Sequence, residues 1–120
     1  MTKIAIPTNG SKGLGDQVAG HFGRCNTYTF LDQFGNFLET IDNRSQHTSG
    51  SDLPPELLKK HEAEILLCNE LGPSALNLCN KLAIKVYVGQ AKTVKQIFQM
   101  WKSGKIKKAG ADDICQEHKL

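Results

Sequence analysis

Short apolar runs alternate with segments of helical periodicity along most of this sequence, and this alternation restricts the fold more than any other feature. Apolar runs bounded by turn residues predict buried strands, whereas apolar residues repeated at helical spacing predict amphipathic helices. A strand, helix, strand, helix order predicts a largely parallel sheet covered by helices on both faces. The expected strands cover 2–7, 28–31, 37–41, 63–68 and 83–88, and the expected helices cover 53–58, 73–82 and 93–101.

The second and third expected strands are joined by residues 32–36, a turn that contains glycine, so they form an antiparallel hairpin at one edge of the sheet. The strands over 2–7 and 63–68 are then expected to be neighbours at the centre. The carboxyl ends of such strands form the crevice where open α/β sheets bind ligands. We expect residues 8–24 and 69–74 to be the two walls of this crevice.

The length and composition suit one domain with one site. The chain has 120 residues, of which 39% are hydrophobic, and its net charge is +3. No run approaches the ~20 apolar residues of a membrane span, and the start lacks the apolar region of a signal peptide, so a cytoplasmic protein is expected. Basic and acidic residues are interleaved, which argues against a nucleic-acid surface.

The segment His21-Phe22-Gly23-Arg24-Cys25 is the most informative part of the expected crevice. It ends a glycine-rich stretch over 9–24 that has no sustained period, and long loops of this kind are usually functional or mobile. Imidazole and thiolate ligate iron, while a guanidinium donates hydrogen bonds to sulfide or carboxylate. The same side chains could instead hydrogen-bond loop carbonyls, and the pattern alone leaves both interpretations open.

Two further places could contribute to a site. Gly72 and Pro73 open the second expected helix, so its first backbone N–H groups would point into the crevice, although a simple helix start explains the same residues. Cys115 and His118 resemble a metal-ligand pair, but two ligands cannot complete a four-coordinate site. They could form a mobile arm that folds over a cluster.

The remaining cysteines differ in their expected roles. Cys79 lies on the apolar stripe of the second expected helix and is predicted to be a core residue. Cys68 ends a central strand, so packing and a role near the site are both possible. Without a secretory signal, a disulfide framework is not expected. The glycines of residues 10–15 match no phosphate-binding motif, and no hydrolytic motif is present.

Four segments, over 3–8, 21–24, 71–75 and 84–87, resemble in their order and spacing the dinitrogenase iron-molybdenum cofactor biosynthesis family, the NifX-like domain also found at the carboxyl end of the NifB protein. The resemblance implies a ribonuclease H-like three-layer α/β/α fold with a five-stranded mixed sheet and one antiparallel strand. It also implies non-catalytic binding of iron-molybdenum cofactor or iron-sulfur precursors. Residues 1–108 form the expected domain, with the polar region from Lys105 leading into a carboxyl-terminal tail over 109–120.

Carried over by position, the resemblance implies His21 and Arg24 as cluster-site residues, with Cys25 matching members that have cysteine after the motif. Nucleases of this topology need acidic residues on the first strand, which here reads Ile4-Ala5-Ile6. Metallocluster donor and acceptor proteins are the expected partners of a monomer or weak dimer. The alternative is a metal-free interaction module that uses its hairpin edge. The expected binding residues are Asn9, His21, Arg24, Gly72 and Ser74, and the expected metal ligands are His21, Cys25, Cys115 and His118.

Overall fold

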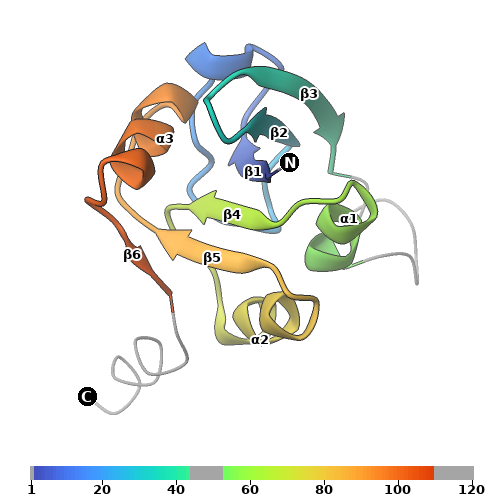
Figure 1. Cartoon of the computed structure of the whole chain (residues 1–120). Coiled ribbons are helices and arrows are strands. Elements are labelled where there is room, and N and C mark those ends of the chain that lie inside the picture. The colour runs from blue at the N-terminus through green and yellow to red at the C-terminus, as the bar shows by residue number, and fades with distance from the viewer. Residues whose placement is uncertain (1, 44–52, 110–120) are drawn as a thin grey trace.

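A computed structural model of the chain describes residues 2–43 and 53–109, and a mixed sheet with the strand order β3-β2-β1-β4-β5-β6 lies at its centre (Figure 1). β1 pairs in parallel with β4, and β4 with β5, which confirms the expected central pair. β2 is antiparallel to β3, as the hairpin predicted, and it is also antiparallel to β1. The strands are β1 (Lys3–Thr8), β2 (Thr27–Asp32), β3 (Phe37–Asp42), β4 (Ile65–Cys68), β5 (Lys85–Val88) and β6 (Lys107–Lys108).

The helices cover both faces of the sheet and give a three-layer arrangement (Figure 1). They are α1 (Pro54–Lys60), α2 (Pro73–Lys81) and α3 (Val94–Lys102), with a short 3-10 helix, η1 (Gly13–Gly15), in the first loop. α1 and α2 contribute to one apolar cluster, and α3 to the other. In the two described stretches of chain, no helix is both long and apolar enough to span a membrane.

Successive residues of the central strands point to opposite faces of the sheet, as the pleat requires. In β1, Ala5 packs in the cluster with α1 and α2, while Ile4 and Ile6 pack in the cluster with α3. In β4, Leu66 and Cys68 join the first cluster. Burial on both faces explains why these strands are continuous apolar runs rather than alternating ones.

The expectation of five strands with one antiparallel is corrected by β6, a second antiparallel strand that pairs with β5. The segment from Lys105 was expected to be polar tail, because a two-residue strand has no sequence period. Packing explains the strand: a Cβ added to Gly89 would lie 2.6 Å from Cγ2 of Ile106, so glycine leaves room for this buried isoleucine. The amide of Ala109 also donates to the carbonyl of Val86 at 2.6 Å.

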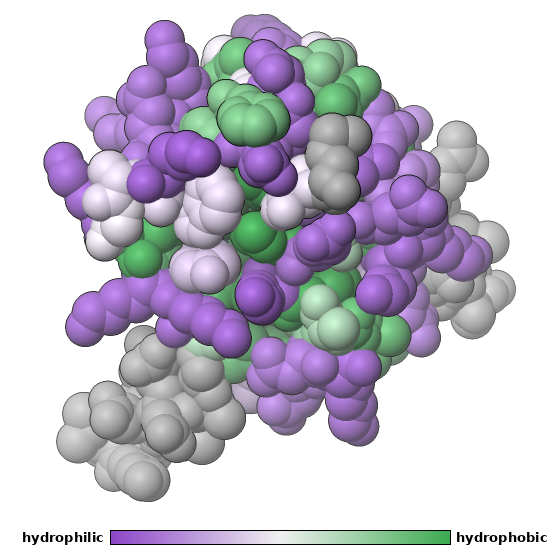
Figure 2. Space-filling model, viewed as in Figure 1, coloured by the Kyte–Doolittle hydropathy of each residue, from purple (hydrophilic) through white to green (hydrophobic). Residues whose placement is uncertain are grey.

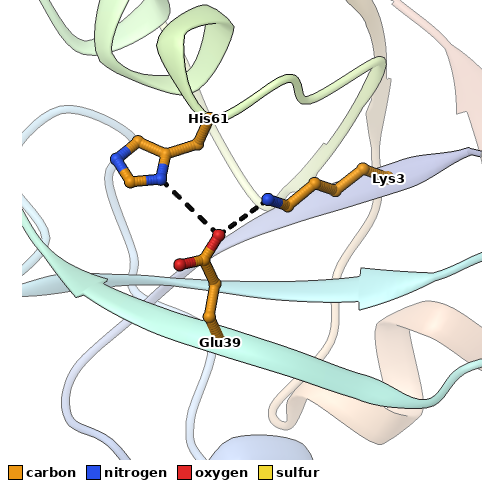
Figure 3. A network of polar contacts seen from close by, with 3 residues as sticks. All are labelled: Lys3, Glu39 and His61. Atoms are coloured by element: carbon orange, nitrogen blue, oxygen red, sulfur yellow. Dashed lines mark hydrogen bonds and ion pairs between the residues drawn. The ribbon is translucent and has the colours of Figure 1, made fainter.

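Lys3, Glu39 and His61 connect the end of α1 to the sheet (Figure 3). The Lys3 Nζ atom lies 2.7 Å from Oε2 of Glu39, and the His61 Nδ1 atom lies 3.5 Å from the same oxygen. The His61 ring also stacks on the Phe30 ring, with 5.6 Å between centroids. The hydrogen bond and charge of Lys3 lower the pKa of the Glu39 carboxyl.

This lowered pKa predicts a pH-dependent contribution to stability. A carboxyl whose pKa is lower in the folded state stabilises the fold above its unfolded pKa, and this contribution is lost as pH falls through the folded pKa. We expect Glu39→Gln to remove it, at most about 1 kcal/mol because the side chain is partly exposed. Urea unfolding from about pH 6 to pH 3 should show the two free energies converging in acid, and a constant difference would contradict the assignment. Glu64→Gln, at an exposed carboxylate before β4, is the control.

Candidate functional site

The two expected walls of the crevice meet at the carboxyl ends of β1 and β4. The backbone amide of Phe22 donates to the carbonyl of Glu70 at 3.0 Å, which joins the first loop to the segment after β4. Asn69 joins that segment to the next loop, since its Nδ2 donates to the Ala91 carbonyl at 2.8 Å and its Oδ1 accepts from the Ala91 amide at 3.1 Å. Contact between these walls therefore agrees with the sequence-based expectation.

Phe22 determines how the HFGR segment is oriented. Its side chain is buried, and its ring centroid lies 5.7 Å from that of the buried Tyr28. Gly23 follows with a φ of 97°, a backbone conformation that glycine adopts without strain. With Phe22 held in the core, His21 and Arg24 on either side of this pair are exposed.

A cavity of about 160 Å³ lies at this segment. It brings together four of the residues expected in the site, namely Asn9, His21, Arg24 and Cys25. Gly72 and Ser74 do not line it. Ser74 instead lines a separate cavity of about 180 Å³, together with Phe22, Gly23 and residues of α1 and α2. Ser74 and the four site residues of the loop thus line different cavities, whereas Phe22 and Gly23 of the same loop share the cavity of Ser74.

The exposed face of the 160 Å³ cavity is basic and polar. The Nδ1 atom of His21 lies 3.1 Å from Oε1 of Glu70, and the two side chains are 62% and 66% exposed. The Arg24 guanidinium makes no hydrogen bond or ion pair with any part of the chain that the structure describes. Its donors are therefore available to a ligand.

Cys25 differs from its exposed neighbours because its side chain is buried. Nδ2 of Asn43 donates to the Cys25 carbonyl at 2.9 Å and lies 3.8 Å from Sγ. Burial raises the pKa of the Cys25 thiol, and the interaction with the Tyr28 hydroxyl opposes this increase only in part. At neutral pH the group is a thiol, whereas metal ligation requires the thiolate.

Cys68 and Cys79 are fully buried in the same apolar cluster, which confirms the core position predicted for Cys79 and decides in favour of packing for Cys68. Burial raises the pKa of both thiols, that of Cys79 to about 12. Cys115 and His118 lie outside the described residues. Within 2–43 and 53–109, no three His, Cys, Asp or Glu side chains are grouped closely enough to hold a metal ion.

Three residues that organise the site were not predicted from the sequence. The buried Asp16 carboxylate accepts hydrogen bonds from the backbone amides of Gly10, Lys12 and Gln17 at 3.1, 3.0 and 2.7 Å. Asn43 holds the Gly23 and Cys25 carbonyls, and Glu70 contacts His21. An acidic residue in a glycine-rich loop is a recognisable signal for Asp16. Asn43 and Glu70 act over long sequence separations and give no comparable signal.

The fold and the site define a small three-layer α/β protein with a basic polar cavity in the loop that follows β1. The chain belongs to the dinitrogenase iron-molybdenum cofactor family, whose sequence pattern matches residues 2–104. This confirms the resemblance found in the sequence. The family is concerned with the biosynthesis or binding of the iron-molybdenum cofactor.

Solved structures with the same fold include the orange protein from Desulfovibrio gigas in its apo form, which is 28% identical, with a TM-score of 0.79 over 92% of this chain and 94% of that one. A candidate NifB protein from Thermotoga is 24% identical, with a TM-score of 0.75 over 90% and 93% of the two chains. A candidate dinitrogenase from Methanocaldococcus jannaschii is 15% identical, with a TM-score of 0.64 over 90% and 94%. These last two show similarity of fold alone. No protein with a curated description matches the sequence.

Proposed function

We propose that this protein is a non-catalytic carrier of iron-molybdenum cofactor or a related iron-sulfur cluster during metallocluster assembly. The observation that carries the proposal is that one cavity is lined by an exposed His21 imidazole and by an Arg24 guanidinium that pairs with no other described residue. An imidazole nitrogen can coordinate iron, and a guanidinium can donate hydrogen bonds to cluster sulfides. Asn9 on the same cavity adds an amide side chain.

A site with few exposed metal ligands suits a cluster that is transferred to another protein. Every coordinate bond to the protein must break before a cluster can be transferred, and among the described residues of the cavity only His21 is an exposed ligand. We propose Cys25 as a second ligand, which would have to lose its proton and its contact with Asn43. Cys115 and His118 are proposed as further ligands, and the α2 start at Gly72 and Ser74 as an additional anion contact.

The comparisons support this function at the level of the family. The family description names the iron-molybdenum cofactor, and the orange protein was solved in an apo form, a term used for a protein without its bound group. We further propose a ribonuclease H-like topology for the domain over 1–108, which the β3-β2-β1-β4-β5 order with β2 antiparallel supports. Cytoplasmic donor and acceptor proteins of metalloclusters are the proposed partners.

Anaerobic loading with iron and sulfide tests the carrier function. We expect charge-transfer absorbance, with iron and acid-labile sulfide bound, and the double variant His21→Ala, Arg24→Ala should lose most of both. His61→Ala is the matched control, since it removes an imidazole that lies at the end of α1 and not on the cavity. Equal binding by the folded double variant would show that the site is elsewhere.

The metal-free interaction module remains a second candidate because one edge of the sheet is apolar. Phe34, Phe37 and Leu38 are 69%, 48% and 39% exposed in and after the β2–β3 turn. Figure 2 shows hydrophobic surface at the top of the view, where Figure 1 places β3. Protein that is purified without oxygen, holds no metal, and takes up none on loading would favour this candidate.

A further inference from the structure

We propose that Glu70 is a positioning residue for His21: its carboxylate holds the ring so that Nε2 presents a free lone pair to the ligand. The proposal rests on the proposed function for the identity of that ligand, an iron-containing cluster. Glu70 lies in the segment after β4, and its side chain contacts the His21 ring in the loop after β1.

The contact between the two side chains favours one tautomer of the ring. The Nδ1 atom lies 3.1 Å from Glu70 Oε1. An ionised carboxylate can only accept hydrogen bonds, so a proton on Nδ1 is favoured over a lone pair that would face the carboxylate. In a neutral imidazole the other nitrogen then has the lone pair. Nε2 is thereby the atom available to coordinate a metal.

Glu70 can act in this way because its own backbone is held in place. Its carbonyl accepts the hydrogen bond from the Phe22 amide, next to His21 in the chain, at 3.0 Å. The preceding residue, Asn69, is hydrogen-bonded through its side chain to both backbone groups of Ala91. The carboxylate therefore extends from a fixed segment toward a ring whose neighbouring residue, Phe22, is anchored in the core.

The His21 and Glu70 side chains are exposed, so a positioning role for Glu70 can be distinguished from a structural role. Ion pairs this exposed contribute little to folding, so loss of the carboxylate should leave the unfolding transition unchanged. A carboxylate that orients a ligating histidine, in contrast, typically changes metal affinity by about 10-fold to 100-fold. Glu70→Ala should therefore weaken cluster binding and change the tautomer of the His21 ring, but leave the stability of the fold unchanged.

The first measurement uses the metal-free protein. Long-range proton–nitrogen correlation spectra of the His21 ring, at a pH where the ring is neutral, should show the Nδ1–H form in the parent. Glu70→Ala should lose this preference, while Glu64→Ala, an exposed carboxylate before the same strand β4, should keep it. An unchanged ring tautomer in Glu70→Ala would overturn the proposal.

The second measurement uses protein loaded anaerobically with iron and sulfide. Glu70→Ala should bind cluster about 10-fold to 100-fold more weakly than the parent and Glu64→Ala, with the same urea midpoint. Unchanged cluster affinity despite a changed tautomer would also overturn the positioning role. If the parent itself binds no cluster while its tautomer depends on Glu70, the carrier function fails and the control of the ring by Glu70 stands.

Discussion

Asp16→Ala is expected to lower the free energy of unfolding by about 3 kcal/mol, because it leaves three backbone amides of the first loop without their acceptor. The carboxylate of Asp16 is buried and accepts from Gly10, Lys12 and Gln17. An unpaired buried donor costs about 1 kcal/mol or more, and these donors lie close enough to the surface for the lower value to apply. The same loop leads to His21, so cluster binding should weaken as well.

Urea unfolding and amide exchange at Gly10 and Lys12 measure the effect. Asp16→Asn should be intermediate, since the amide retains one acceptor oxygen but has no charge. Asp42→Ala removes an exposed carboxylate from the end of β3 and is the matched control. A loss for Asp16→Ala no larger than that for Asp42→Ala would mean that the loop does not depend on its internal carboxylate.

Asn43→Ala should lower the free energy of unfolding by about 2 kcal/mol and release the segment that carries the candidate ligands. The buried Asn43 amide donates to the Gly23 and Cys25 carbonyls at 3.0 and 2.9 Å. Without it, the two carbonyls lose this hydrogen bond and the Cys25 thiol loses one of its polar neighbours. Alkylation of Cys25 under native conditions should therefore become faster.

Peptide mapping of alkylated protein, together with urea unfolding, checks this result. The control is Asn77→Ala, which removes the same amide from an exposed position on α2. Cys68 and Cys79, which are fully buried, should stay protected in both variants. An alkylation rate of Cys25 equal to that of the parent would contradict a role for Asn43 in holding this segment.

Local sequence patterns were sufficient for most of the sheet. The apolar run over 63–68 contains β4, and the glycine turn over 32–36 joins β2 to β3 as an antiparallel hairpin. The proline at position 73 marked the start of α2. These features depend on neighbouring residues, so a single sequence contains the information. β6 depends instead on the contact between Ile106 and Gly89, far apart along the chain, and no local pattern indicates it.

The amino-acid order alone determined that an imidazole, a guanidinium and a thiol occur together in a glycine-rich loop beside the central strands. The tertiary structure decided which of them face a ligand. Burial of Phe22 and the Asn43 contact place the Cys25 thiol in the interior, while His21 and Arg24 remain exposed. A loop without periodicity has no preferred face of its own, so side-chain direction is set by distant partners such as Asn43.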